Sequence, residues 1–328
     1  HAMAAPTPVS SFLHSATMVQ AGVFLLMRLW PVLSGTPEWS WIIAGAGVCT
    51  LLIGAYAAIF QNDLKGLLAY STISHLGLIT VLLGIGSTLG IVAAIFHTLN
   101  HATFKASLFM AAGIIDHESG TRDMRKLRGL YRVLPYTGTL AIVATAAMAG
   151  VPLLNGFLSK EMFFAEALLV GGPGNWGMSL AALLMGIFAV AYSLRFLYVF
   201  FGPLATDLPK VPHEPPRWMR FPVEFLVLCC LVVGVAPGWS VGPLLNNAVV
   251  AVLGAQAPSY SRAWWHGSNW PLSMSGVALG DGVALKPPLP CRWAPSPVAL
   301  PPVTPVLPLL KSRASSPSAS RTPARASC

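Results

Sequence analysis

The chain has 328 residues, of which 55% are hydrophobic and only 9% are charged, and its mean hydropathy is +0.66. A soluble domain carries about 25% charged residues, so this composition excludes a water-soluble globular enzyme and a disordered chain, and it predicts an all-α integral membrane protein. Residues 285–328 hold six basic residues and no acidic one, and so supply most of the net charge of +9; this charge therefore does not indicate a nucleic-acid-binding face.

Seven segments are apolar and long enough to cross a bilayer as helices, which takes about 20 residues each. The fifth segment is too long for one straight crossing, and we expect a break in it. A shorter apolar segment, residues 241–253, is expected at the interface or as half of a hairpin. In chain order the seven segments are residues 8–29, 41–60, 67–85, 90–115, 136–170, 179–201 and 221–237.

Basic residues occur in the loops on one side of these segments only. The loops after the second, fourth and sixth segments hold nine of them, whereas the loops after the first, third and fifth hold none. Because Lys and Arg stay on the cytoplasmic side, the alternation predicts a topology that starts in the cytoplasm. The nine residues are Lys65, Arg122, Arg125, Lys126, Arg128, Arg132, Lys210, Arg217 and Arg220.

The fourth segment carries protonatable residues at helical spacing. His97, His101 and Lys105 follow one another at intervals of four and fall on one helix face, where they extend over about 12 Å. Imidazole titrates near neutral pH, so we interpret the row as a proton relay. Snorkelling or structural pairing is the alternative. A zinc site is disfavoured because the pattern lacks the Glu of HExxH and a third ligand, and no metal is expected.

The fifth segment is interrupted by Gly150, Pro152 and Gly156, which predict a helix break. Unwound backbone at membrane depth is tolerated where it lines a cavity, and broken helices commonly carry transporter ion sites. Lys160 and Glu161 follow within two turns, and free carbonyls at a helix end stabilise a lysine charge. The alternative is a re-entrant piece that leaves Lys160 near an interface.

Four further polar residues have simpler explanations beside a functional one. His14 and His75, each within an apolar segment, are either packing residues or relay members. Asp63 and Lys65 lie in a tight loop, where a helix cap or an ion pair accounts for them. The chain has no nucleotide-binding fingerprint and its five cysteines lack paired spacing, so no cofactor is expected.

Several motifs, in order along the chain, resemble the antiporter-like proton-translocating family, which includes the large membrane-arm subunits of respiratory complex I. Within this family the chain is most similar to the A-type subunits of Mrp-type multisubunit cation/proton antiporters, including their Pha-like K⁺/H⁺ branch. The similarity covers about residues 1–260. The motifs are Asp63-Leu-Lys-Gly-Leu-Leu-Ala-Tyr-Ser-Thr-Ile-Ser-His75, Phe96-His-Thr-Leu-Asn-His-Ala-Thr-Phe-Lys105 and Gly156-Phe-Leu-Ser-Lys-Glu161.

The resemblance implies inverted five-helix units, each with a broken helix, of which this chain matches most of the second. It implies a multi-pass subunit of a hetero-oligomeric complex in the bacterial inner membrane, with H⁺ and Na⁺ or K⁺ as the transported ions, other antiporter subunits and the lipid bilayer as partners, and no nucleic acid. The implied relay consists of His97, His101, Lys105, Lys160 with Glu161, and His14, supported by Asp63, Lys65 and His75.

The chain departs from the family in two ways. Gln20 occupies a position where related sequences often have Lys, and the first broken helix would lie before His1, which predicts a fragment. Residues 1–256 are the expected antiporter-like region, 257–284 an interfacial or partial span, and 285–328 a Pro/Ser/Arg-rich tail. The tail is either native and disordered or, as the abrupt change of composition favours, the product of a shifted reading frame or a truncation.

Two other functions remain open at this point. The chain fits a proton-pumping membrane subunit of a NADH:quinone oxidoreductase, in which partner subunits hold the redox groups. It also fits a membrane scaffold without transport activity. The same buried residues would serve the first alternative, whereas the second predicts that they have no role in ion movement.

Overall fold

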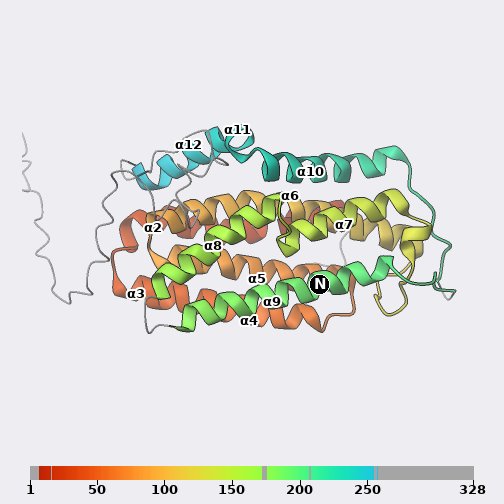
Figure 1. Ribbon diagram of the computed structural model, residues 1–328, viewed down its shortest axis with the longest axis horizontal. Coiled ribbons are helices and arrows are strands. Elements are labelled where there is room, and N and C mark those ends of the chain that lie inside the picture. Colours follow the sequence, from red (N-terminus) through yellow and green to blue (C-terminus); the bar gives the residue numbers. More distant parts are fainter. Residues whose placement is uncertain (1–6, 16, 172–175, 207, 255–256, 258–328) are drawn as a thin grey trace, which may run out of the picture. The chain divides into compact units, whose positions relative to one another are not determined.

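The computed structural model describes residues 7–15, 17–171, 176–206, 208–254 and 257, and its regular structure in these ranges is helical, without a β-strand (Figure 1). The all-α prediction is confirmed for this part of the chain. The expected interfacial segment, apart from Ala257, and the whole tail lie outside the described residues.

Fifteen helical elements follow one another in the described chain, and those that bear on the site are α1, α2 and α5 to α10. The predicted segment over 221–237 corresponds to α10, and the shorter segment over 241–253 corresponds to α12. The elements are α1 (Thr7–Ser15), α2 (Met18–Leu33), α3 (Pro37–Trp39), the π-helix η2 (Ser40–Ala44), α4 (Gly45–Ile59), α5 (Leu64–Ile85), α6 (Thr88–Ser119), the 3-10 helix η3 (Leu130–Arg132), α7 (Pro135–Ala149), α8 (Asn155–Gly171), α9 (Trp176–Leu197), the 3-10 helix η4 (Tyr198–Phe200), α10 (Arg217–Val235), α11 (Pro237–Ser240) and α12 (Gly242–Leu253).

The first apolar segment is not the single helix that its composition predicts. Thr17, with φ −119° and ψ −83°, lies outside helical geometry between α1 and α2. Side chains bond the carbonyls that this interruption leaves free: the Thr17 hydroxyl donates to Phe12 O over 3.1 Å and Gln20 Nε2 donates to Ser15 O over 3.0 Å. Such local bonds compete with the helix, and they accompany an interruption that the sequence did not predict in this segment.

The interruption predicted in the fifth segment lies between α7 and α8. Gly150, with φ +91°, ends α7 in the left-handed conformation that glycine adopts at little cost. Leu153 also has a positive φ, of +73°. The α8 helix then starts at Asn155, so Lys160 lies in its second turn and close to the end of α7.

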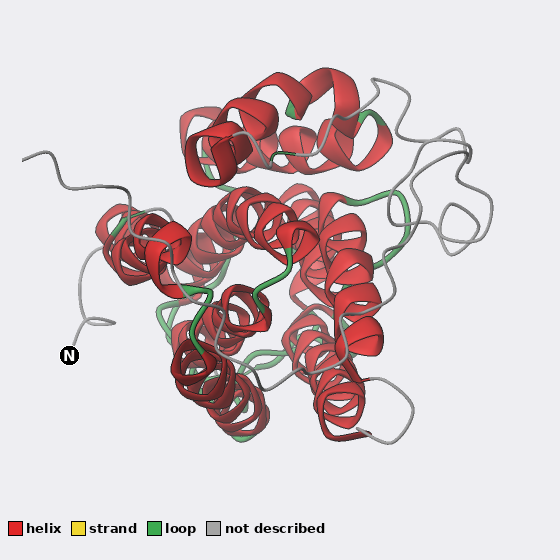
Figure 2. Cartoon of the chain, turned by 90° about the vertical axis from the view of Figure 1, so that its left-hand side faces the viewer, coloured by secondary structure: helices red, strands yellow, loops and turns green. Residues whose placement is uncertain are grey.

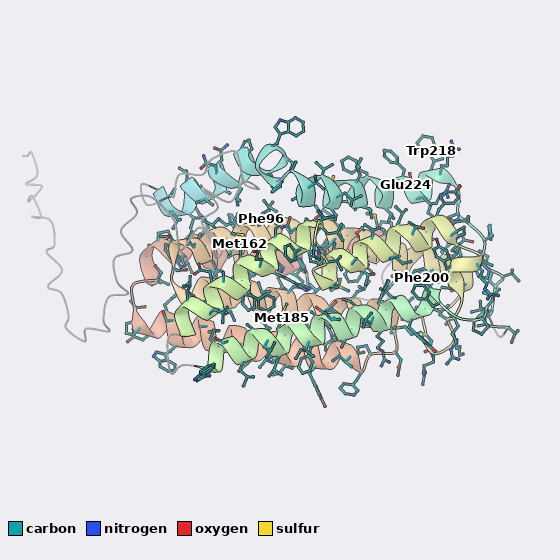
Figure 3. The ribbon with its side chains drawn as sticks, in the orientation of Figure 1. Phe96, Met162, Met185, Phe200, Trp218 and Glu224 are labelled. Carbon is teal, nitrogen blue, oxygen red and sulfur yellow. The ribbon has the colours of Figure 1, made fainter. Side chains whose placement is uncertain are left out.

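Five helical stretches in the described chain are long and apolar enough to cross a membrane: Thr7–Leu33, Pro37–Ile59, Leu64–Ile85, Trp176–Phe200 and Arg217–Val235. Large apolar side chains project outward from several of these stretches, for example Trp218 of α10, whereas Met162 and Met185 are buried (Figure 3). An apolar exterior is what a lipid-facing surface requires.

Helix α6 has a different character, because its buried residues include many polar ones. The view that is turned by 90° shows most helices nearly end-on (Figure 2). In α6 the buried side chains include His97, Asn100, His101 and Lys105. A helix with many polar side chains therefore lies inside the bundle.

Helices α4 and α5 approach one another closely through glycines. A Cβ atom on Gly77 would lie 2.4 Å from the backbone nitrogen of Leu51, and one on Gly84 would lie 2.4 Å from that of Ala44. Small residues are the usual means by which membrane helices bring their backbones together. This packing fixes the position of α5, which carries His75.

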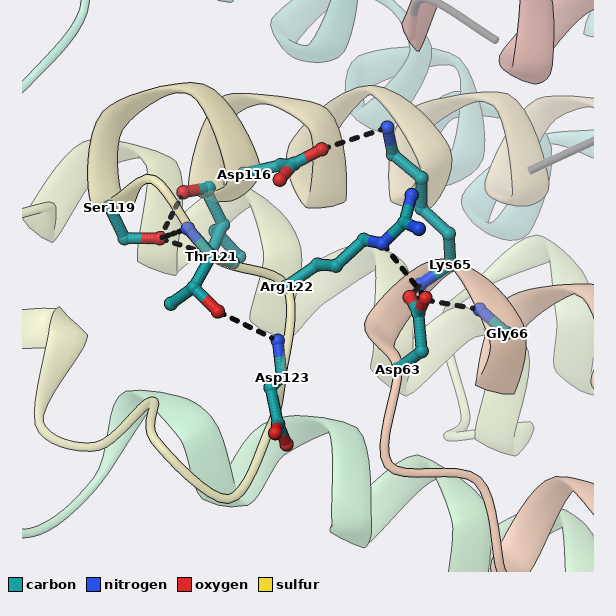
Figure 4. Close-up of polar contacts among 9 residues, drawn as sticks. Asp63, Lys65, Gly66, Asp116, Ser119, Thr121, Arg122 and Asp123 are labelled. Atoms are coloured by element: carbon teal, nitrogen blue, oxygen red, sulfur yellow. Dashed lines mark hydrogen bonds and ion pairs between the residues drawn. The ribbon is translucent and has the colours of Figure 1, made fainter. Parts of the chain in front are cut away.

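The loops that carry the basic residues contact one another at one end of the bundle. Arg195 of α9 donates to Asn62 Oδ1 over 2.6 Å, and Gly129 N donates to Phe201 O over 3.0 Å. Figure 4 shows Asp63, which accepts from Lys65 N and Gly66 N, and the ion pairs Arg122–Asp63 at 2.8 Å and Lys65–Asp116 at 3.0 Å. Asp63 and Lys65 therefore act here as a helix cap and as ion-pair partners.

Candidate functional site

The relay residues predicted on α6 all lie in the interior of the bundle. His97, His101 and Lys105 are each 0% exposed. Their spacing of four residues keeps them on one face of α6, and this face meets α5, α7 and α8. Removing three ionisable groups from water in this way is costly unless neighbouring groups compensate for it, so the contacts of each one define the site.

His75 lies at the centre of a hydrogen-bonded chain that joins four helices. Its Nδ1 is 3.0 Å from His97 Nε2, and its Nε2 is 3.2 Å from the hydroxyl oxygen of Tyr192 on α9. His97 Nδ1 is 2.9 Å from Ser159 Oγ on α8. Each imidazole uses both of its nitrogens, one as a donor and the other as an acceptor when the ring is neutral, so the chain can carry its hydrogen bonds in either direction.

His101 lies beside these hydrogen-bonded side chains, but its own hydrogen bond is to a residue of α2. Its Nδ1 is 3.2 Å from Gln20 Nε2 of α2. Its ring centroid is 5.4 Å from that of His75 and 6.3 Å from that of His97. His101 Nε2 is buried and has no hydrogen-bond partner in the described part of the chain. Since the Gln20 amide donates to Ser15 O, the break between α1 and α2 positions the residue that holds His101.

Lys105 is bonded to neutral groups only. Its Nζ donates to Leu68 O over 3.3 Å, to Ser71 Oγ, and to Met148 Sδ over 3.4 Å. No carboxylate pairs with it among the described residues. A carbonyl, a hydroxyl and a thioether solvate an ammonium group in part, but they add no opposite charge.

Lys160 lies against the end of α7. Its Nζ donates to Met148 O over 2.6 Å and to Ala149 O over 3.1 Å. The last carbonyls of a helix have no partner within the helix and carry the negative end of its dipole. Met148 therefore contacts both buried lysines, Lys105 through its sulfur and Lys160 through its carbonyl oxygen.

Amide side chains attach the break to α6. Asn100 Nδ2 donates to Asn155 O over 3.0 Å, and Asn155 Nδ2 donates to Thr103 Oγ1 over 2.8 Å. These bonds join the first residue of α8 to α6. The distance from Lys160 to the α6 residues is consequently set by direct contacts rather than by loop geometry.

Four predicted residues lie outside this cluster. Glu161 is half-buried and lines, with Lys160, a cavity of about 670 Å³ between α8 and α9. His14 stacks on Phe109 at a centroid distance of 5.5 Å, one turn of α6 beyond Lys105. Asp63 and Lys65 belong to the loop end. The structure thus brings together His75, His97, His101, Lys105 and Lys160.

Sequence reasoning missed several members of the site. Ser159 directly precedes Lys160, but a serine in a helix gives no distinctive pattern. Tyr192 lies in an otherwise apolar segment. Its complete burial, with 0% of the side chain exposed, is what marks it as a site residue, and only the structure shows this burial. Ser71 and Met148 likewise become recognisable only from the lysines that they contact.

Comparison with known proteins gives consistent results. The family model described as NADH:quinone oxidoreductase/Mrp antiporter, TM, matches residues 1–199. A probable K(+)/H(+) antiporter A/B subunit of Rhizobium meliloti (strain 1021) is 67% identical over 289 residues, which cover 87% of this chain and 29% of that protein. The Na(+)/H(+) antiporter A-type subunit of Alkalihalophilus pseudofirmus is 43% identical over 312 residues, which cover 87% of this chain and 39% of that protein.

Solved structures agree with the sequence relatives. A chain of the Mrp complex from Dietzia sp. DQ12-45-1b superposes with a TM-score of 0.71 at 38% identity, covering 84% of this chain and 30% of that one. A chain of the membrane-bound sulfane sulfur reductase, an archaeal respiratory membrane complex, gives a TM-score of 0.65 at 25% identity, covering 78% and 50%. The chain thus spans between 29% and 39% of the length of the two sequence relatives described here.

Proposed function

Because the chain belongs to the NADH:quinone oxidoreductase/Mrp antiporter transmembrane family, we propose that it is a proton-translocating part of the A-type subunit in a multisubunit monovalent cation/proton antiporter. The observation that carries this proposal is the buried cluster of three histidines and two lysines. In a membrane bundle such residues are rare and usually mark an ion pathway.

The geometry supports a transfer of protons by alternating occupation. A proton on Lys160 is stabilised by the carbonyls of Met148 and Ala149, and a proton on Lys105 by those groups of α5 and α7 that it contacts. Since both lysines contact Met148, a charge on one disfavours a charge on the other. The histidines between α5 and α6 offer neutral sites that accept a proton when a lysine releases it.

The short hydrogen bonds supply a path between helices. When His97 gains a proton at one ring nitrogen and loses the proton of the other, its hydrogen bonds to His75 and Ser159 exchange donor and acceptor. These bonds are 3.0 and 2.9 Å long. Tyr192 ends the chain at α9 with a hydroxyl that both donates and accepts. The proposed path therefore crosses the bundle interior from α9 to α8.

Potassium is the cation that we propose for exchange. The 67% identical relative is named as a probable K(+)/H(+) antiporter component, whereas the 43% identical one is named as a Na(+)/H(+) antiporter component. The higher identity favours K⁺. Adding K⁺ or Na⁺ to acid-loaded vesicles that contain the complete complex distinguishes the two, and a response to Na⁺ alone would contradict this assignment.

The alternative of a membrane subunit of a NADH:quinone oxidoreductase receives less support. The family model includes both kinds of protein, but the relatives described above are named as antiporter subunits. The subunits that co-purify with the chain decide between them: small membrane subunits support the antiporter, and flavin and iron–sulfur subunits support the oxidoreductase.

The relay itself is tested by Lys160→Ala and His101→Ala in the intact complex. Each change should abolish cation-driven dissipation of a pH gradient in inverted vesicles, because it removes a proton carrier. Lys126→Ala is the matched control, since this lysine lies exposed in the loop that follows α6. Unchanged proton flux in assembled Lys160→Ala and His101→Ala complexes would overturn the assignment and favour a scaffold.

A further inference from the structure

Helices α6 and α8 share a second polar contact, at the end of α6 opposite the basic loops. Ser87 caps the N-terminus of α6, and its hydroxyl oxygen accepts from Gly90 N over 2.8 Å. The same hydroxyl donates to Glu166 Oε2 of α8. The Glu166 residue is only 2% exposed, and its second oxygen, Oε1, is buried without a hydrogen-bond partner in the described part of the chain.

Neither charge state of Glu166 is fully satisfied by its surroundings. Within the described residues no lysine, arginine or histidine bonds to this carboxyl. The anion gains from the Ser87 hydroxyl and from the positive end of α6, whereas burial favours the neutral acid. The ionisable residues on the helices packed against α8 are Lys65, Tyr70 and His75 on α5, His97, His101, Lys105, Asp116, His117 and Glu118 on α6, Tyr136 on α7, Tyr192 and Arg195 on α9, and Arg217, Arg220, Glu224, Cys229 and Cys230 on α10.

The position of Glu166 continues the hydrogen-bonded chain. Ser159 and Glu166 are seven residues apart, which places them on the same face of α8 about 10 Å apart along its axis. Ser159 bonds to His97, and Glu166 bonds to Ser87, the N-cap of the helix that carries His97. No side chain occupies position 90, where a Cβ atom would lie 2.7 Å from Ser87 Oγ and 3.9 Å from Glu166 Oε2.

We propose that Glu166 is the proton-carrying carboxyl at the end of the path opposite the basic loops. A proton passes from the imidazole of His97 to the hydroxyl of Ser159, which gives up its own proton to water. Water then carries a proton along two turns of α8 to the Glu166 carboxylate. Release of this proton to the aqueous phase at the opposite membrane face restores the carboxylate. The role rests on the proposed antiporter function, and it adds the group through which the relay exchanges protons on that side.

The test uses Glu166→Gln and Glu166→Asp in the complete antiporter complex, assayed as cation-driven pH-gradient dissipation in inverted vesicles. Glutamine keeps the size of the side chain and accepts from Ser87 but does not ionise. We expect Glu166→Gln to lose at least about 100-fold in exchange rate, as for removal of a proton-transfer group, and Glu166→Asp to retain part of the rate. Glu38→Gln, which changes an exposed carboxyl of α3, is the control and should keep the full rate.

The same assay separates this proposal from the proposed function. If Lys160→Ala abolishes exchange while Glu166→Gln keeps the full rate, Glu166 has no such role and the relay stands. If Lys160→Ala also keeps the full rate, the relay itself fails. Should Glu166→Gln not assemble, Ser87→Ala provides a second measurement by difference infrared spectroscopy: it should shift the carboxylic C=O band that appears when the complex is acidified, and an unshifted band would overturn the proposal.

Discussion

The loop end of the bundle and its interior surround positively charged side chains differently. At the loop end, five lysine and arginine side chains pair with carboxylates, whereas in the interior Lys105 and Lys160 contact only neutral oxygen and sulfur atoms among the described residues. The five pairs are Lys65–Asp116, Arg122–Asp63, Arg125–Asp123, Lys210–Glu118 and Arg220–Glu214, at distances from 2.8 to 3.6 Å.

The difference separates lysines and arginines that form ion pairs from the lysines of the proposed relay. A lysine beside a carboxylate is held in its charged form, and it joins two segments of the chain. A buried lysine among neutral acceptors has no such partner, so its charged and neutral forms are closer in free energy. The comparison therefore predicts that substitutions of the interior lysines lower transport, whereas substitutions of the paired residues at the loop end lower stability.

The largest expected effect is on transport, from Lys105→Met. Methionine fills a similar volume but carries no proton, so exchange should fall by about 100-fold or more. The assembled complex should unfold at the same or a higher temperature, because a desolvated charge without a counter-ion is removed. Vesicle exchange and thermal unfolding are measured on the same preparation. Normal exchange would place Lys105 with the structural charges.

A medium effect, on stability alone, is expected for Lys65→Met. The change leaves Asp116 without its partner, and the loss of a hydrogen bond between charged groups costs about 1–3 kcal/mol. Exchange per assembled complex should be retained. The double variant Lys65→Met/Asp116→Asn should recover part of the loss, because neither charge then remains unpaired. Loss of exchange in an assembled Lys65→Met complex would show that paired lysines also carry protons.

The smallest effect is expected for Arg125→Ala at the exposed loop. Hydrogen bonds from Arg125 lower the pKa of Asp123 to about 2. Since this pKa is depressed, any stabilisation is present above the unfolded pKa of about 4 and is lost as the pH falls toward 2. Between pH 6 and 8 the stability lost in the variant should be small and independent of pH, as is usual for exposed ion pairs, and exchange should be unchanged. Parallel pH profiles of the variant and the unchanged complex check this, and diverging profiles would contradict it.

Local sequence periodicity was enough to find the α6 part of the site. Residues four apart on a helix share a face whatever surrounds them, so His97, His101 and Lys105 were identifiable together, and Gly150 with Pro152 was enough to indicate an interrupted helix. The bonds of His75 to His97 and Tyr192 were not identifiable, because they depend on how α5 packs between α6 and α9. Spacing along one helix contains no information about neighbours across helices.

The break between α1 and α2 was missed for a related reason. Neither Gly nor Pro marks it, and the hydropathy of residues 8–29 continues across it. The side chains of Thr17 and Gln20 replace the missing helical bonds, and Gln20 also reaches His101. Gln20 thus bonds both to a free backbone carbonyl and to a residue of the candidate site, and the sequence alone indicates neither bond.

In the described part of the chain, the Lys160 ammonium group is bound by backbone atoms and not by side chains. The two acceptors are the peptide oxygens of Met148 and Ala149, which any residue at these positions supplies. A substitution at position 149 should therefore leave the acceptor in place, because every residue type carries the same peptide oxygen. The contact depends on Lys160 and on Gly150, whose positive φ ends α7 at this point. The geometry of the backbone can in this way supply an acceptor that the identity of the residue carrying it does not reveal.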